Sequence, residues 1–375
     1  MHSLTEEKHL QKVNLDSSNV TDEGISNLTG MTQLQSISLR DTRVGDRALD
    51  QIAKLPNVNA LFLAGTHITD KGVSRIAGMK GLTQLSLSET SVTADGIKLL
   101  ATLPRLETLH IGQIRISDSG LACLQGLPSL KILTLVRTPI TDKGLEVFRH
   151  MPLKSLDLKF TKITDAGLSA LPNSLEFLYL DGTAITDKGI SNLKHLSNLR
   201  VLTLRNNAIT DKGVGELANL PKLEELRLNQ TATSDQSCGV LAKLPMLERL
   251  TLSETAVTDS GLREIAKLKH LTDLFVEGDK IGDVGLGYLE NMPALRRLSL
   301  ENTEIGDDGV SALAHIQSLQ SLDFNKTSIT DVGLTRLASL KNLRTVELRS
   351  CPGVTTAGID ALRRKLPLLR IEYKR

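Results

Sequence analysis

Leucine and other aliphatic residues recur along the chain with a period of about 24 residues. Each copy reads L-x-x-L-x-L-x-x-T-x-I-T-D-x-G-L-x-x-L-x-x-L, and in one copy the aliphatic positions are Leu199, Leu202, Leu204 and Ile209. A period of roughly 20–50 residues indicates a stacked array whose units contact only their neighbours. The position held by Thr in most copies marks fifteen of them: Ser18, Thr42, Thr66, Thr90, Ile114, Thr138, Thr161, Thr183, Asn207, Thr231, Thr255, Asp279, Thr303, Thr327 and Cys351.

Two patterns alternate within each copy. The segment L-x-x-L-x-L alternates apolar and polar residues, which predicts a half-buried strand. The segment T-D-x-G-L-x-x-L-x-x-L has apolar residues three apart, which predicts a helix. The Asp at the start of that helix is placed to cap it by accepting from backbone N–H groups. We expect capping and not metal binding, because one carboxylate per repeat forms no ligand cluster. The aspartates are Asp22, Asp46, Asp70, Asp118, Asp142, Asp165, Asp187, Asp211, Asp235, Asp259, Asp283, Asp307 and Asp331.

Stacking these units predicts an α/β solenoid. A strand, a helix and a parallel strand connect with a right-handed crossover. A helix is about 10 Å across, whereas neighbouring strands lie about 4.8 Å apart, so the helical side has to be the longer one. We therefore expect a right-handed horseshoe of about fifteen repeats, with a concave parallel β-sheet and convex short helices.

The residues at this spacing resemble the leucine-rich-repeat superfamily. The I-T-D-x-G-L segment is most similar to the cysteine-containing subclass of F-box adaptor proteins, with Thr where that subclass has Cys, and to bacterial leucine-rich-repeat families that use Thr. The resemblance spans roughly residues 10–370. It implies recognition of a macromolecule on the concave face and no chemistry. The chain has no F-box segment, so a ligase-adaptor role is not implied.

We expect a single leucine-rich-repeat domain over residues 1–375. Residues 1–9 would be a partial N-terminal repeat or remnant, 10–360 the repeats and 361–375 a C-terminal cap. Because residues 1–9 are too few to cover the end of an array, we hypothesise that an upstream part is missing. Two repeats are short, since 23 residues separate Thr138 from Thr161 and 22 separate Thr161 from Thr183.

Charge and cysteine content favour a cytoplasmic protein without nucleic acid as a partner. The net charge is only +2, and no apolar run approaches the roughly 18 residues of a membrane span. Residues 1–10 lack a secretory signal, although a secreted or cell-surface protein is the alternative if a leader was removed. Cys123, Cys238 and Cys351 lie in separate repeats, too far apart for a disulfide, so we expect free thiols.

No motif predicts catalysis. The chain has no G-x-S-x-G, no G-x-x-x-x-G-K and no H-E-x-x-H, and its eight histidines lack ligand spacing. His110 is the only histidine at a predicted concave position. We therefore expect no enzyme, no cofactor and no metal.

The candidate partner-binding residues are those expected on the concave face. Three of the nine aromatic residues, Phe160, Phe177 and Tyr179, fall there in two adjacent repeats, which are also the short ones. Grouped apolar side chains on a solvated face are typical of interaction sites, although they can also simply pack on one another across strands. The predicted site comprises Ile132, Val136, Lys159, Phe160, Phe177, Tyr179, Asp181, Val201, Arg205, Arg227 and Phe275.

The predicted function is a non-catalytic scaffold that binds a protein partner on its concave face. The alternative is the recognition domain of a larger signalling, ligase-type or surface-adhesion protein whose effector region lies outside this chain. We expect a monomer, with self-association through the end repeats left open because a bare end strand can pair.

Overall fold

A computed structural model describes residues 9–374, in two compact units, Met1–Thr183 and Ala184–Arg375. Both units are built from the same strand–turn–helix repeat. The single domain expected over 1–375 therefore stays a prediction. The predicted partial N-terminal repeat falls almost wholly on residues 1–8, which lie outside the described residues.

The first unit contains eight of the described strands, each three residues long. They are β1 (Lys12–Asn14), β2 (Ser36–Ser38), β3 (Ala60–Phe62), β4 (Gln84–Ser86), β5 (Thr108–His110), β6 (Ile132–Thr134), β7 (Ser155–Asp157) and β8 (Phe177–Tyr179). Its α-helices are α1 (Asp22–Ile25), α2 (Asp46–Ile52), α3 (Asp70–Ile76), α4 (Ala94–Leu99), α5 (Asp118–Leu121) and α6 (Asp142–Leu145). Its 3₁₀ helices are η2 (Ser26–Leu28), η3 (Leu100–Thr102), η4 (Ala122–Gly126), η5 (Glu146–Phe148) and η6 (Gly167–Ala170).

The second unit continues the pattern. Its strands are β9 (Val201–Thr203), β10 (Glu225–Arg227), β11 (Arg249–Thr251), β12 (Asp273–Phe275), β13 (Arg297–Ser299), β14 (Ser321–Asp323), β15 (Thr345–Glu347) and β16 (Arg370–Glu372). Its helices are α7 (Asp187–Ser191), α8 (Asp211–Glu216), η7 (Leu217–Asn219), α9 (Asp235–Leu241), α10 (Asp259–Ile265), α11 (Asp283–Leu289), α12 (Asp307–Leu313), α13 (Asp331–Leu337) and α14 (Thr356–Lys365).

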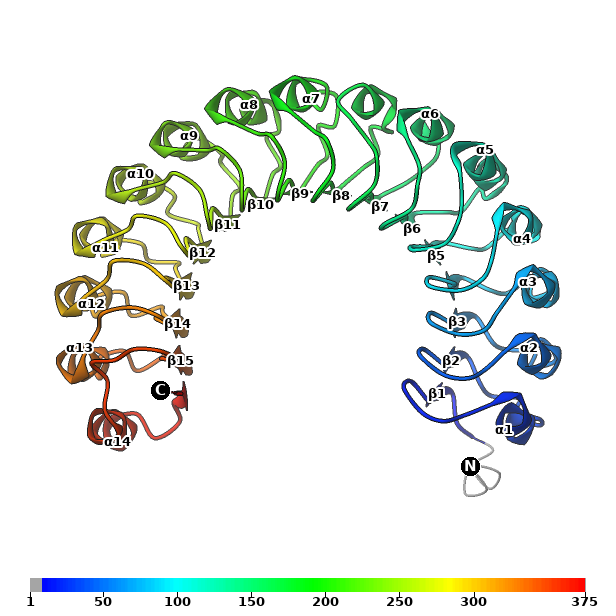
Figure 1. The fold of residues 1–375 in the computed structure, drawn as a ribbon, viewed down its shortest axis with the longest axis horizontal. Coiled ribbons are helices and arrows are strands. Elements are labelled where there is room, and N and C mark those ends of the chain that lie inside the picture. Colours follow the sequence, from blue (N-terminus) through cyan, green and yellow to red (C-terminus); the bar gives the residue numbers. More distant parts are fainter. Residues whose placement is uncertain (1–8, 375) are drawn as a thin grey trace. The chain divides into compact units, whose positions relative to one another are not determined.

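Within each unit the strands pair in parallel and in chain order, on the inner side of a curve whose outer side carries the helices (Figure 1). The middle residue of each strand is aligned with that of its neighbour, as Leu202, Leu226 and Leu250 are, and these side chains are fully buried. The predicted fold class is confirmed: fifteen strand–helix repeats are followed by a final strand, β16. In the second of the two short repeats the helix is reduced to the 3₁₀ turn η6.

Apart from Asp165, which precedes η6, the repeated aspartates do not cap their own helices, and for them this prediction was wrong. The N-cap residues are Thr, Ser or Gly, and the Asp is the first or an early helical residue. Its carboxylate instead accepts from the cap of the next repeat: Asp46 Oδ1 from the Thr69 N–H (2.8 Å) and Asp46 Oδ2 from the Thr69 hydroxyl (2.7 Å). The Thr69 hydroxyl in turn accepts from the Lys71 N–H (3.3 Å). The helix is therefore capped by the side chain of the preceding Thr, and the Asp connects neighbouring repeats.

The same connection recurs through both units. It joins Asp22 to Gly45, Asp70 to Thr93, Asp118 to Thr141, Asp142 to Thr164, Asp187 to Thr210, Asp211 to Ser234, Asp235 to Thr258, Asp259 to Gly282, Asp283 to Gly306, Asp307 to Thr330 and Asp331 to Thr355. A hydrogen bond to a charged carboxylate is worth roughly 1.5–3 kcal/mol. These bonds therefore help to hold each repeat against the next, in addition to the apolar core.

One repeat lacks this connection. Ala94 occupies the position of the Asp, and the next cap residue, Ser117, pairs its hydroxyl with Ser119 (3.0 Å). We expect Ala94→Asp to supply the missing acceptor and to raise the free energy of unfolding by about 1 kcal/mol. The measurement is urea unfolding followed by circular dichroism, with Ala94→Ser as the control that adds a polar atom but no carboxylate. An unchanged midpoint in the Asp variant would show that the bridge adds no stability.

The residue before the repeated Thr lies in the left-handed region of the backbone. Its φ is positive at Asp41, Glu89, Arg137, Phe160 and the corresponding residues of other repeats. The Thr that follows donates its hydroxyl to the carbonyl three residues earlier, as Thr161 does to Leu158 (2.6 Å). This turn ends each strand and sets where the next side chains emerge on the concave face.

Candidate functional site

Phe177 and Tyr179 lie on one face of β8, because alternate residues of a strand share a face. The register places Ser155 of β7 and Ile132 of β6 in the row of Phe177. Ile132 is 39% exposed, whereas Phe177 is half-buried. Since Ser155 lies between them, Ile132 and Phe177 are roughly 10 Å apart and do not form one continuous apolar surface.

Lys159 and Asp157 hold the ring of Tyr179. The Lys159 ammonium lies 5.3 Å from the centroid of the Tyr179 ring, within the range of a cation–π interaction. The same ammonium lies 3.2 Å from Asp157 Oδ2. Burial raises the pKa of Asp157, and Lys159 partly offsets that rise. The two side chains therefore position the Tyr179 ring, and Lys159 is not an unpaired charge.

Phe160 is the most exposed aromatic side chain of the predicted site. It is 47% exposed, and its φ of 57° lies in the left-handed region, where a bulky side chain costs roughly 1–2 kcal/mol. The Arg137 guanidinium lies 4.9 Å from its ring centroid. A Cβ added at Gly182 would come within 2.5 Å of the ring, so the ring rests against glycine backbone. The turn common to the repeats sets the backbone conformation, and one cation and one glycine contact the exposed ring.

We name Arg137, Lys159, Phe160, Phe177 and Tyr179 the aromatic patch. Two further predicted residues flank it: the Asp181 carbonyl accepts from the Phe160 N–H (2.9 Å), and Val136 directly precedes Arg137 in the chain. Val136 and Asp181 are both half-buried. The structure therefore brings Val136, Lys159, Phe160, Tyr179 and Asp181 together at the carboxyl ends of β6, β7 and β8, with Phe177 at the start of β8 on the face of Tyr179 and Ile132 apart.

The predicted residues of the second unit do not gather. Val201 is only 5% exposed, so it offers a partner almost no surface, contrary to the expectation. Arg205 donates to Gln230 (3.1 Å), and Arg227 pairs with Glu225 (2.7 Å), which also holds Arg249.

Phe275 is half-buried in β12, and Thr251 separates it from the row position of Arg227. These side chains are separate features of a mixed-charge face.

Sequence reasoning missed Arg137 and Gly182, which complete the patch. A signal was present, because the left-handed position is Gly in Gly65, Gly182 and Gly278 and Asn in Asn206 and Asn302. Gly and Asn tolerate that conformation best, so their shared position marks the turn and places Phe160 within it. A second pairing of a cation with a ring was also missed: the Arg40 guanidinium lies 4.8 Å from the centroid of the Phe62 ring.

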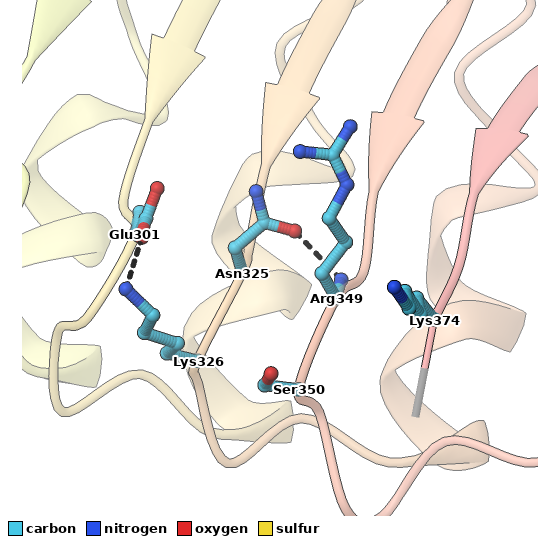
Figure 2. A pocket seen from close by; sticks show the side chains of 6 residues that line it. All are labelled: Glu301, Asn325, Lys326, Arg349, Ser350 and Lys374. Carbon is cyan, nitrogen blue, oxygen red and sulfur yellow. Dashed lines mark hydrogen bonds and ion pairs between the residues drawn. The ribbon is translucent and has the colours of Figure 1, made fainter.

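A polar hollow of about 400 Å³ lies at the carboxyl ends of strands in the second unit (Figure 2). Lys326 pairs with Glu301 (2.6 Å), and Asn325 Oδ1 accepts from the Arg349 N–H (2.6 Å). The Arg349 guanidinium also pairs with Glu372. Lys326 and Arg349 are thus already bonded to carboxylates of the protein, and the hollow is assigned no ligand.

Among the described residues, His110, Asp279 and Asp323 have shifted pKa values and lie in different repeats. Burial and the nearby Arg40 lower the pKa of His110, and its Nδ1 lies 2.8 Å from the Thr134 hydroxyl. Burial raises the pKa of Asp279 and Asp323, but these residues belong to different repeats. Among residues 9–374, no group of three or more His, Cys, Asp or Glu could hold a metal ion.

No helix in the described part of the chain is long and apolar enough to cross a membrane. The three cysteines are unpaired, as predicted.

Comparison with solved structures gives related folds at low identity. A leucine-rich-repeat protein of Leptospira interrogans has a TM-score of 0.62 and 20% identity, over 99% of this chain and 98% of that one. An internalin of Listeria monocytogenes has a TM-score of 0.53 and 23% identity, over 91% of this chain and 88% of that one. A structure of TLR13 in complex with ssRNA13 has a TM-score of 0.55 and 18% identity, over 91% of this chain and 60% of that one.

No curated protein matches the chain. Models of protein families do match it. Residues 116–348 match the model described as a leucine-rich repeat region, and residues 7–28 match a leucine-rich-repeat model. The first match spans more than half of the sequence. The chain therefore belongs to the leucine-rich-repeat family.

Proposed function

We propose that this chain is a non-catalytic scaffold that binds a protein partner through the aromatic patch. The leucine-rich-repeat fold is generally a protein-interaction scaffold. The observation that carries the proposal is Phe160, an aromatic side chain that is 47% exposed and held between Arg137 and Gly182. Exposed apolar side chains grouped on a surface are typical of interaction sites.

The composition of the patch also fits a protein partner. Tyr and Arg are enriched among residues whose truncation costs most at interfaces, and Phe160, Phe177 and Tyr179 supply large apolar surfaces. Lys159 and Arg137 fix two of these rings before any partner arrives, which reduces the side-chain entropy lost on binding. The absence of a catalytic role is part of the proposal: the carboxyls with raised pKa, Asp157, Asp279 and Asp323, lie in separate repeats.

The thiols support a reducing compartment. Cys238 and Cys351 are buried and unpaired, and burial raises the pKa of Cys238 to about 12. Unpaired cysteines are typical of proteins kept in a reducing environment, so we propose a cytoplasmic location.

The test compares variants that affect the patch in different ways. Tyr179→Ala removes a ring, and we expect it to weaken partner binding by about 2 kcal/mol, roughly 30-fold in Kd. Phe160→Asn also removes a ring, but Asn is the natural residue at the same repeat position in Asn206 and Asn302. We therefore expect Phe160→Asn to lose binding by a similar factor while the free energy of unfolding stays within about 0.5 kcal/mol of the wild type.

The measurement is affinity capture of partners from the source cells, followed by titration of the captured partner by biolayer interferometry. Phe62→Ala is the matched control, because Phe62 occupies the strand position of Tyr179 and lies under a cation in the same way, in β3 outside the patch. If the two patch variants bind the partner as the wild type does, or if Phe62→Ala loses binding equally, the aromatic patch is not the contact surface.

A further inference from the structure

A second surface lies at the last repeat of the second unit, far along the chain from the aromatic patch. Lys341, Arg344 and Lys365 surround a hollow of about 200 Å³, whose other lining residues are Leu343, Leu366, Pro367, Leu368 and Leu369. Leu368 is 81% exposed, the largest exposed fraction given for any large apolar side chain among the described residues. We name Lys341, Arg344, Lys365 and Leu368 the basic edge patch.

The cations of this patch have no carboxylate partner in the described part of the chain. The Lys341 ammonium donates to the Ala338 carbonyl (2.8 Å), and the Arg344 guanidinium donates to the Lys341 and Leu343 carbonyls (3.0 and 3.1 Å). No acidic residue lines the hollow. The polar hollow of Figure 2 is the opposite case, because its Lys326 and Arg349 are paired with carboxylates.

The charge is concentrated at this end of the sequence. Residues 341–375 contain nine Lys and Arg against three Asp and Glu, whereas the whole chain has a net charge of only +2. The rest of the chain is therefore net acidic. The positive charge is a local property of this region and does not reflect the average composition.

Helix electrostatics explains only part of the patch. Lys365 lies in the last turn of α14, together with Arg363 and Arg364, where cations complement the helix dipole. Lys341 has a comparable role in the preceding repeat, because it donates to the carbonyl of Ala338, the C-cap of α13, whereas Arg344 donates to carbonyls beyond that helix. Helix electrostatics does not explain Leu368 either: the same repeat position is polar at Arg105, Ser129, Lys222 and Asn342, and where it is apolar, at Met246, the side chain is 49% exposed against 81% for Leu368. An exposed Leu among unpaired cations points to a contact with another molecule.

We propose that the basic edge patch docks an acidic segment of a partner protein, which inserts one apolar side chain into the hollow. Charge complementarity requires an acidic occupant, because the rim carries cations only. The hollow of about 200 Å³ is smaller than the roughly 300–1,000 Å³ of small-molecule sites, so it accepts a side chain and not a cofactor. No aromatic residue lines it for base stacking, which favours protein over single-stranded nucleic acid. This proposal is independent of the aromatic patch.

The probe is a fluorescein-labelled peptide of glutamates with one central leucine, titrated with the full chain by fluorescence anisotropy. We expect saturable binding that weakens as salt is raised, because the rim charges are exposed and screened. Replacing the central leucine of the peptide by serine should weaken binding about tenfold, and so should Leu368→Ser. The double variant Lys341→Glu, Arg344→Glu should weaken binding by more than tenfold.

Lys80→Glu is the matched control. Lys80 occupies the position of Lys341 in the first unit and donates to the Ala77 carbonyl (2.9 Å) as Lys341 does to Ala338. We expect it to bind the peptide as the wild type does, and circular dichroism establishes that all variants are folded.

Three results would overturn the proposal. The first is no saturable binding of the leucine-containing peptide by the wild type. The second is an equal loss in Lys80→Glu, or no loss in Leu368→Ser. The third is tighter binding of a single-stranded RNA or of phosphatidylserine vesicles, with the same dependence on Lys341 and Arg344, which would assign the surface to a different class of partner.

Discussion

Replacing Gly144 by Ala is expected to lower the free energy of unfolding by about 3 kcal/mol. Gly144 lies in α6, and a Cβ there would come within 2.6 Å of Asp118 Oδ1 and 3.0 Å of Leu121 Cδ1. Asp118 accepts from the Thr141 N–H (2.7 Å) and the Thr141 hydroxyl (2.6 Å). The added methyl group has to displace that carboxylate, so it combines overpacking of roughly 1–3 kcal/mol with weaker hydrogen bonds to a charge.

The chain contains two internal comparisons for this experiment. Gly215 also lies in a helix, α8, but a Cβ there meets no atom within 4 Å, so Gly215→Ala should stabilise by about 0.5–1 kcal/mol through helix propensity. Ser237 occupies the repeat position of Gly144, and its hydroxyl donates to Asp211. The hydrogen bonds from Ser237 and Ser234 together outweigh the effect of burial and lower the pKa of Asp211.

Gly144→Ser is therefore expected to destabilise less than Gly144→Ala, although serine is the larger residue. Urea unfolding of the three variants gives the order directly. A serine variant less stable than the alanine variant would show that crowding alone, and not the carboxylate connection, sets the requirement for glycine.

The role of these glycines shows how much of the fold could be predicted from the sequence. The repeat of Leu199, Leu202 and Leu204 was sufficient to predict strands, helices and their stacking, because burial of one apolar face follows from periodicity alone. It could not show that Asp46 bonds to Thr69, because that contact joins residues 23 apart and depends on the stacking distance between repeats. The pattern T-D-x-G was therefore assigned to capping within one helix, when it connects two.

For the candidate site, the sequence predicted the sheet face on which a residue lies, but not the side chains that contact it. Alternation along β8 put Phe177 and Tyr179 on one face, which the register confirms. The ring of Phe160 depends on Arg137 one repeat earlier and Gly182 one repeat later, and neither was predicted. Val201 was also placed without its surroundings: its strand position predicted an exposed side chain, but in the structure it is only 5% exposed.

The second large effect concerns Asp279, which replaces the repeated Thr in a buried turn. In other repeats the Thr hydroxyl donates to a carbonyl three residues earlier, as Thr303 does to Leu300 (2.6 Å). Asp279 Oδ1 accepts from the Thr255 N–H (2.7 Å), but Oδ2 is buried and has no hydrogen-bond partner among the described residues. The side chain is 3% exposed. Burial, reinforced by Glu254 and Glu277, raises the pKa of Asp279 from 3.8 to about 6.

The direction of the pH effect follows from that shift. A carboxyl whose pKa is higher in the folded protein than in the unfolded chain destabilises the fold when it is ionised. The penalty is absent well below the unfolded pKa of 3.8, where Asp279 is protonated in both states; it grows as pH rises from there to about 6 and is complete above that. At one pKa unit per 1.36 kcal/mol, the shift from 3.8 to about 6 amounts to about 3 kcal/mol at neutral pH.

Asp279→Asn is expected to recover about 3 kcal/mol at pH 7.5 and less than about 1 kcal/mol at pH 4. Asn207 is the natural precedent at the same repeat position: its Oδ1 accepts from the Ile185 N–H (3.1 Å) and its Nδ2 donates to the Leu204 carbonyl (3.1 Å). The amide therefore keeps the bond from Thr255 and supplies the donor that an ionised carboxylate lacks. The measurement is the difference in unfolding free energy between variant and wild type from pH 4 to 8. Asp323 is unchanged in both proteins, so its own raised pKa cancels in this difference. A difference that is constant with pH would mean that Asp279 is not the group whose ionisation strains this turn.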